Sequence, residues 1–105
     1  MSVNIRKIQL EKLIFEELSC IVPYEMEDPR VVDIEITRVE LSNDLKKVKV
    51  FFISRGNKDH ELEEEILNRA SGFIRFQISN AILLKKTPKF LFFLDEKLQE
   101  EIEDE

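Results

Sequence analysis

The sequence predicts a single α+β domain with the element order helix, strand, strand, helix, helix, strand. Three observations predict this fold class. Apolar residues recur at helical spacing up to residue 21, and β-branched residues alternate with polar ones between residues 31 and 54. A second, broken helical pattern begins near residue 59 and ends before a short apolar run at 90–94. With 105 residues, of which 43% are hydrophobic, the chain is expected to build one core and no second domain.

The first helix is predicted from Val3 to about Ile21. Its buried face is expected to consist of Leu10, Leu13, Ile14, Leu18 and Ile21. Ser2 or Asn4 can cap its start, and Pro23 is expected to end it. A polar connector, Tyr24–Arg30, follows.

The chain contains one cysteine, Cys20, so no intrachain disulfide can form. Because cysteine often behaves as a small apolar side chain, Cys20 is expected in the core. The sequence shows neither a membrane-spanning apolar run nor a signal-peptide pattern, and we therefore expect a cytoplasmic protein.

Two strands are predicted to form an antiparallel hairpin. Val32, Ile34 and Ile36 share one face of the first strand, and the apolar phase then moves to Val39 and Leu41, which predicts a bulge near Arg38. A turn is expected at Ser42-Asn43-Asp44-Leu45. The second strand, Lys47–Ser54, directs Val48, Val50 and Phe52 inward.

The third helical region is predicted to break in its middle. Asp59 can cap a helix whose buried face carries Leu62, Ile66 and Ala70. A break or a close approach is expected at Gly72, and Ala70-Ser71-Gly72 is interpreted as a kink between two helices. A new apolar face follows, built from Ile74, Ile78, Ala81 and Ile82. Pro88 excludes further helix, and Phe90–Leu94 is the third strand. The remainder, Asp95–Glu105, is expected to be a frayed, solvated acidic end.

Charge is distributed unevenly along the chain. The net charge is -6, yet the stretch from Ile66 to Leu94 holds Arg69, Arg75, Lys85, Lys86 and Lys89 and no acidic residue. Phosphate contacts act within about 10 Å in ordinary salt, so a negative net charge does not exclude nucleic acid as a partner.

Catalysis has little support in the sequence. The only histidine, His60, lies between Asp59 and Glu61 in the first turn of an exposed helix, where a solvated surface role is expected. Gly56 and Gly72 are too far apart for a phosphate-binding glycine loop, and no cluster of Cys and His could hold a structural metal. We therefore expect no enzyme, no cofactor and no metal.

Nucleic-acid binding has better support. Arg75, Ser79 and Lys86 fall on one stripe if the third helix persists that far, and the kink would expose amide groups at its N-terminus. Lys46, Lys47 and Lys49 on the hairpin could extend this positive surface. A solvated helix face with lysines for solubility explains the same composition equally well.

The outward side of the sheet has two interpretations. Phe51, Ile53, Leu91 and Phe93 are expected to face away from the inward strand residues, as the aromatic residues of a base-stacking sheet do. The alternative is an outer patch covered by the chain's own ends or a strand covered on both sides. The sequence has no RNP1-like segment, and this favours the covered patch.

Four segments in order carry a family resemblance. They are Glu27-Asp28-Pro29-Arg30-Val31, Val39-Glu40-Leu41-Ser42 with Asp44-Leu45, Leu67-Asn68-Arg69-Ala70-Ser71-Gly72-Phe73-Ile74-Arg75, and Thr87-Pro88 before Phe92 and Leu94-Asp95. With them the chain resembles the ribosome-binding factor A family from the first helix through Leu98. The resemblance implies a KH-like type II domain over residues 1–98, a three-stranded sheet with helices packed on one face, and a short acidic tail at 99–105.

The resemblance also implies a function. Such a protein would be a non-enzymatic assembly factor that binds the immature 30S subunit, contacts 16S rRNA and assists late maturation, including processing of the rRNA 5′ end. Its implied partners are the 30S subunit, the 5′-end region of 16S rRNA and other assembly factors; it would bind no membrane and act as a monomer. The kink Ala70-Ser71-Gly72 stands where ordinary KH domains have a Gly-x-x-Gly loop, so rRNA shape and phosphate positions would dominate binding.

The predicted RNA-binding residues come from the kink, the third helix, the loop after it and the hairpin. They are Asn68, Arg69, Ala70, Ser71, Gly72, Arg75, Ser79, Lys85, Lys86, Lys46, Lys47 and Lys49, whereas Lys89 is expected to contribute least. The chain departs from the family at Asn80, Ala81 and Leu83, where relatives commonly have further basic residues, and this thins the basic stripe. Lys86 replaces an aromatic residue and Phe76 a usually small polar one, and Phe76 with Leu83 suggests an apolar rim. Two alternatives stay open: a protein-interaction adaptor that uses this rim and the acidic tail, and a general single-strand RNA binder.

Overall fold

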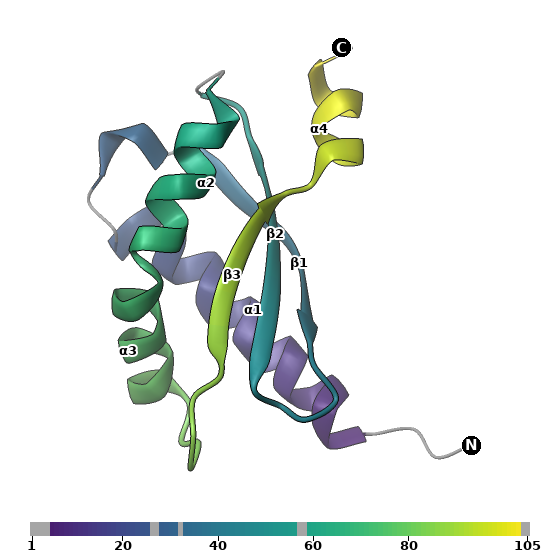
Figure 1. The fold of residues 1–105 in the computed structure, drawn as a ribbon, viewed down its shortest axis with the longest axis vertical. Helices are drawn as coiled ribbons and strands as arrows, with labels where there is room; N and C mark the ends of the chain where they lie inside the picture. Colours follow the sequence, from purple (N-terminus) through teal and green to yellow (C-terminus); the bar gives the residue numbers. More distant parts are fainter. Residues whose placement is uncertain (1–4, 26–27, 32, 57–58, 104–105) are drawn as a thin grey trace.

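The fold is an open sheet with helices layered on one side (Figure 1). The computed structural model describes residues 5–25, 28–31, 33–56 and 59–103. The elements are α1 (Ile5–Glu25), the 3-10 turn η1 (Pro29–Val31), β1 (Ile34–Leu41), β2 (Lys47–Ser54), α2 (His60–Arg69), α3 (Ser71–Ala81), β3 (Lys89–Leu94) and α4 (Glu96–Glu103). The predicted α+β class and element order are confirmed, and α4 is an addition to them.

The sheet has the strand order β1-β2-β3, with β2 in the centre. β1 and β2 pair antiparallel, whereas β2 and β3 pair parallel across the long connection that contains α2 and α3. The pairing of β1 with β2 shifts register between Ile36 and Arg38, so the predicted bulge is confirmed. The turn between the strands closes with Leu45 at φ 62°, and Asp44 accepts a hydrogen bond from the Lys46 amide.

The core lies between the sheet and the helices α1, α2 and α3. The strands contribute Val48, Val50, Phe52 and Phe92, and the helices contribute Ile14, Leu18, Leu67, Ile74 and Ile78, all of which are fully buried. Val48, Val50 and Phe52 match the predicted inward face of the second hairpin strand, and Ile74 and Ile78 match the predicted second face of the third helical region. Leu67 was not on the predicted face of α2; of that face Ile66 is buried, and Leu62 and Ala70 are half-buried. No helix in the described ranges is long and apolar enough to cross a membrane.

Helix α1 differs from its prediction in two side chains and in its end. Leu13 is 47% exposed and Cys20 is exposed, so neither belongs to the core. The buried residues follow Leu10, Ile14 and Leu18 at intervals of four, and a residue one or two positions away turns roughly 100° or 200° from that face. The helix continues through Pro23 to Glu25, so the predicted end at Pro23 is wrong. A proline has helical φ but no amide proton, so it costs the helix one hydrogen bond, and only two helical residues follow it. The cap candidates Ser2 and Asn4 lie outside the described residues.

The first strand begins later than the alternation indicated. Val31 is buried at the end of η1, and β1 begins at Ile34; Val32 lies outside the described residues. Pro29 opens the 3-10 turn, where its missing amide proton costs no helical hydrogen bond. Asp28 holds this turn together by accepting hydrogen bonds from the side chain and amide of Arg30, which lower the pKa of Asp28 to about 2.

The predicted frayed end at Asp95–Glu105 is wrong for Glu96–Glu103, which form α4. Gln99 is only 3% exposed, and its side-chain amide pairs with both the amide and the carbonyl of Ser54 at 2.8 and 2.9 Å. Since β3 ends at Leu94, Gln99 occupies the place beside β2 that a longer β3 would fill. Hydropathy missed this contact because a polar side chain makes it.

A second set of polar groups joins α2 to α4. Glu63 is 1% exposed and accepts hydrogen bonds from the Ser54 hydroxyl and, at 2.8 Å, from His60 Nδ1, while His60 Nε2 lies 2.9 Å from Glu103. We call Ser54, His60, Glu63, Gln99 and Glu103 the carboxylate network. The predicted solvated surface role of His60 is wrong, because its side chain is only 19% exposed and bridges two helices.

Candidate nucleic-acid interface

Parallel pairing of β2 with β3 brings two basic segments together. Lys47 lies opposite Lys89 in the register, and the Lys89 amide donates to the Lys46 carbonyl at 2.9 Å. The loop that leads into β3 carries Lys85 and Lys86 to the same end of the sheet (Figure 1). We call Lys46, Lys47, Lys49, Lys85, Lys86 and Lys89 the lysine end of the molecule.

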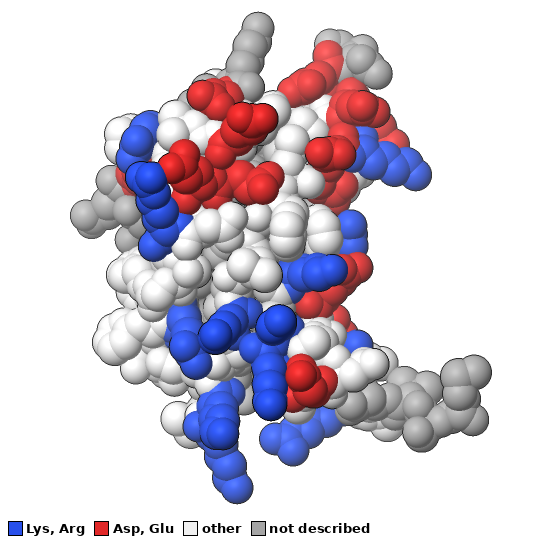
Figure 2. Space-filling model, in the orientation of Figure 1, with Lys and Arg blue, Asp and Glu red and all other residues white. Residues whose placement is uncertain are grey.

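The lysine end is exposed and poor in counter-charges. All six lysines are exposed, and none forms an ion pair with any residue in the part of the chain that the structure describes. Asp44 is the acidic residue of the same turn, and hydrogen bonds from the Ser42 hydroxyl and the Lys46 amide lower its pKa. Figure 2 shows that most acidic side chains of this face lie over its upper part and that its lower part is mainly basic, although some Lys and Arg also stand at the upper edges.

The predicted kink is present and falls at Ala70. This residue has φ -84° and ψ 3°, ends α2 and serves as the N-cap of α3 without a side-chain cap. A Cβ built on Gly72 would meet nothing within 4 Å, so the close approach expected at that glycine is not made by the protein itself. Ser71 and Gly72 stand at the start of α3 with Gly72 exposed, so the surface there is open to a partner.

Helix α3 is shorter than the predicted basic stripe requires. It ends at Ala81, and Ile82 already has extended backbone angles, so Lys86 is not on a helical stripe with Arg75 and Ser79. Ala81 is exposed rather than part of the apolar face. Arg75 donates two hydrogen bonds to the Thr87 carbonyl, at 3.1 and 2.9 Å, and thereby ties the lysine-bearing loop back onto α3.

Three further predicted RNA-binding residues have partners within the protein. Asn68 donates to the Phe92 carbonyl at 3.1 Å and accepts from the Phe92 amide at 2.8 Å, so it joins α2 to the edge of β3. Arg69 forms an ion pair with Glu65 one turn earlier, and the Ser79 hydroxyl donates to the Phe76 carbonyl. The structure therefore gathers the hairpin lysines with Lys85 and Lys86 and gives Asn68 an internal role.

Sequence reasoning ranked Lys89 last and favoured a covered outer sheet face. Lys89 instead lies directly beside Lys47. The outer face is covered in part: Ile53 is buried and Phe51 half-buried, whereas Leu91 is 45% and Phe93 36% exposed. One signal was available: Lys47 and Lys89 each stand immediately before an apolar strand. Only the parallel pairing, which the alternation of residues cannot reveal, makes those two strand starts neighbours.

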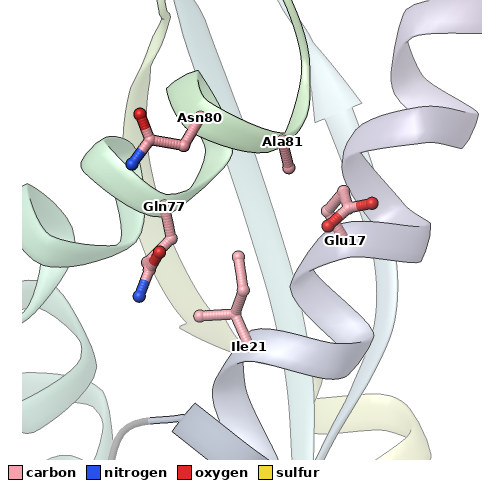
Figure 3. A pocket seen from close by; sticks show the side chains of 5 residues that line it. All are labelled: Glu17, Ile21, Gln77, Asn80 and Ala81. Carbon is pink, nitrogen blue, oxygen red and sulfur yellow. The ribbon is translucent and has the colours of Figure 1, made fainter.

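A shallow hollow of about 210 Å³ lies between α1 and α3. Figure 3 shows its lining: Glu17 and Ile21 come from α1, and Gln77, Asn80 and Ala81 come from α3. Ligand pockets usually measure about 300 to 1,000 Å³ and are largely apolar. The hollow is smaller than that and carries a carboxylate, so it has the character of a groove between two helices.

The carboxylate network contains a serine, a histidine and carboxylates, the residue types of a hydrolytic triad. Its order of contacts differs from that of a triad, because the Ser54 hydroxyl donates to Glu63 and not to the imidazole of His60. A nucleophilic serine needs a base that takes its proton. Here Glu63 is the shared acceptor, and this geometry holds two helices together. No group of His, Cys, Asp and Glu suited to a metal ion occurs among the described residues.

Comparison with known proteins agrees with the fold and with the family resemblance that four segments of the sequence carry. The family described as ribosome-binding factor A matches residues 6–105. The ribosome-binding factor A of Thermodesulfovibrio yellowstonii is 39% identical over 93 residues, which cover 89% of this chain and 79% of that relative. The crystal structure of ribosome-binding factor A from Thermus thermophilus matches with a TM-score of 0.77 and 22% identity, over 84% of this chain and 93% of that one.

A second structural match comes from a complex. Coordinates of the Thermus thermophilus ribosome-binding factor A, fitted into the cryo-EM map of a 30S complex of that protein, match with a TM-score of 0.64 and 20% identity. The match covers 88% of this chain and 93% of that one. At these identities the two Thermus structures establish the likeness of fold.

Proposed function

The chain belongs to the ribosome-binding factor A family, and from this premise we propose that it binds the immature 30S subunit through its lysine end. It would contact 16S rRNA there and assist late maturation, including processing of the rRNA 5′ end. The role is one of binding rather than catalysis, and it would be carried out in the cytoplasm, where small subunits are assembled. A relative of the same fold fitted into the map of a 30S complex supports this proposal.

The observation that carries the proposal is the convergence of six exposed lysines at one end of an acidic protein. Lys47 and Lys89 lie side by side in the sheet, and Lys46 is linked to Lys89 through the backbone. Unpaired lysines held on rigid strands suit phosphates in fixed positions, since phosphate contacts set the register of a protein on its RNA. The open surface at Gly72, at the start of α3, gives the RNA backbone room to approach the kink.

Charge reversal at the paired lysines tests the proposal. The double variant Lys47→Glu with Lys89→Glu is expected to lose co-sedimentation with immature 30S subunits while its thermal unfolding is unchanged, because both side chains are exposed. The matched control is Lys97→Glu, an exposed lysine on α4 at the opposite end.

The salt dependence of binding is a second test. With about four to six phosphate contacts, the affinity of the native protein should fall with salt at a log-log slope of roughly -3 to -5. A flat salt response, or full binding by the double variant, would contradict the proposal.

A second candidate function rests on exposed apolar side chains along α3 and just after its end. Phe76 is 63% and Leu83 97% exposed, with Phe73 nearby at 42%. This apolar rim suits a protein partner, and the chain would then act as an adaptor. The acidic tail contributes less to this alternative than the sequence indicated, because α4 is docked on Ser54. If Phe76→Ser abolishes association with the subunit and the lysine reversals do not, the adaptor is the correct assignment.

A further inference from the structure

The bulge in β1 determines what the outer face of the sheet presents. Ile36 pairs with Phe52 and Arg38 with Phe51, so Thr37 is the extra residue, and its hydroxyl donates to the Phe51 carbonyl and to Asp95. After the bulge Arg38 stands on the outer side, with its guanidinium carbon 3.7 Å from the centre of the Phe51 ring. The Arg38 guanidinium also donates to Glu40 at 2.8 Å, which holds it in place.

Aromatic and apolar side chains continue this row across the sheet. Phe93 lies opposite Phe51 in the register, with ring centres 5.8 Å apart and planes inclined at 32°. Leu91 stands next to it in β3, and both Leu91 and Phe93 are substantially exposed at 45% and 36%. Exposed rings and guanidinium planes on the open face of a sheet are the surfaces on which unpaired bases stack.

Lysines without an ion-pair partner among the described residues border this row on the side of the lysine end. Successive residues on one face of a strand are about 6.6 Å apart, so Lys49, opposite Leu91, lies one step from the aromatic row, and Lys47 with Lys89 lies one step further. The carboxylates on this face are engaged: Glu40 is bound by Arg38, and Glu35 pairs with Arg55 at 2.6 Å. A polyanion with flat apolar bases complements such an arrangement.

The β3 edge of the sheet is closed to a different mode of binding, the addition of a partner strand. Asn68 occupies the amide and carbonyl of Phe92, and Glu64 accepts from the Leu94 amide. A partner strand could not add to β3 along these residues without displacing both side chains. On the β3 side, a ligand is therefore left with the face of the sheet and its side chains.

We infer that the outer face of the sheet, formed by Arg38, Phe51, Leu91 and Phe93, stacks the bases of a single-stranded RNA segment. Lys49, Lys47 and Lys89 hold the phosphates of the same segment. The inference rests on the proposed function and deepens it, because it names the class of rRNA that one surface takes: unpaired nucleotides, in addition to the shape and phosphates of folded rRNA. Lys47, Lys49 and Lys89 belong both to the lysine end and to the strands of this face, so one RNA segment can contact both surfaces.

A tryptophan reporter tests the inference directly. The chain contains no tryptophan, so Phe93→Trp introduces the single indole of the protein. Its fluorescence should be quenched on addition of an unpaired oligoribonucleotide of about a dozen nucleotides, and much less by an RNA duplex of equal length. The matched control is Leu13→Trp, at an exposed position on α1, where no quenching is expected. Unchanged Phe93→Trp emission, under salt conditions in which gel shift shows the oligonucleotide bound, would overturn the inference.

A second pair of variants separates stacking from charge. Phe93→Ala should weaken binding of the unpaired oligonucleotide by about 5- to 100-fold without altering the salt slope, whereas Lys49→Ala should reduce the slope by about 0.7. Circular dichroism on both proteins checks that the fold is retained. If Phe93→Ala loses co-sedimentation with 30S subunits but binds the oligonucleotide normally, the face takes a ribosomal protein and the inference is wrong. The oligonucleotide assay uses no ribosomes, so failure of subunit binding alone would overturn only the proposed function.

Discussion

The two ends of the molecule use charge in opposite ways. At the lysine end, six exposed side chains have no ion-pair partner within the described residues. In the carboxylate network, the Glu63 carboxylate is almost completely buried, and both of its oxygens are bound, one by Ser54 and one by His60. Buried and paired charge joins α2 and α4 to the sheet. Charge that remains exposed and unpaired costs the fold little and is available to a polyanionic partner.

The largest expected effect is at the centre of the carboxylate network. Glu63→Ala should lower the free energy of unfolding by about 2 to 4 kcal/mol, because it leaves the Ser54 hydroxyl and the His60 ring without their buried acceptor. Urea denaturation measures this loss. The control Glu61→Ala, at an exposed position in the same helical turn, should change stability by less than about 0.5 kcal/mol. If Glu63→Ala were as mild as its control, the contrast between the two ends would not hold.

Asn68 sharpens the contrast, because the sequence places it among the RNA-binding residues whereas the structure gives it an internal partner. Asn68→Ala should destabilise the protein by about 1 to 2 kcal/mol through the loss of two hydrogen bonds to Phe92. The slope of RNA affinity against salt should stay unchanged, since no charge is removed. Asn80→Ala, at an exposed position on α3, is the control for stability. A drop in RNA affinity at unchanged stability would instead support a direct contact of Asn68 with RNA.

The smallest expected effect is a pH dependence centred on His60. Burial lowers the pKa of this imidazole, but hydrogen bonds to Glu63 and Glu103 outweigh burial and raise the pKa above its ordinary value of 6.5. A raised folded-state pKa means that the histidine stabilises the fold fully below about pH 6.5 and that this stabilisation disappears as pH rises through the folded-state pKa.

The stability difference between the native protein and His60→Gln, followed by urea denaturation at several pH values, isolates the histidine. It should decrease from mildly acidic to mildly basic pH, while binding at the lysine end should not follow it. A difference that grew with pH would show that the ring is held neutral in the network.

Local features of the fold were predictable because they depend on neighbouring residues. The phase change between Ile36 and Val39 predicts the bulge, and Asp59 before the α2 pattern predicts its cap, which the structure shows as a hydrogen bond from the Leu62 amide to the Asp59 carboxylate. The break at Ala70 follows from the change of apolar face near Gly72. The helical and strand periods are visible within segments of a few residues, and the bulge, the cap and the break each depend on such a short segment.

The carboxylate network and the contacts of Arg75 were less predictable, because polar side chains make them between residues that are far apart in the sequence. Gln99 docks α4 through amide hydrogen bonds to Ser54, and His60 joins Glu63 to Glu103. Neither contact can be predicted from the spacing of apolar residues, because polar side chains make both. The sequence predicts that Arg75 lies on the third helix. Its hydrogen bonds to the Thr87 carbonyl depend on how the loop after α3 folds back, which the sequence pattern does not predict.

The sequence by itself determined the α+β class, the element order, the bulge, the kink and an acid-free basic stretch. Each of these features depends on residues that are close together in the chain. Only the tertiary structure decided that Lys47 and Lys89 are neighbours, that Asn68 bonds to the backbone of Phe92, and that the Phe93 ring lies beside the Phe51 ring. The physical reason is the place of β3 in the sheet, parallel to β2 and beside α2. The parallel pairing joins distant segments through backbone hydrogen bonds, which no side-chain pattern specifies.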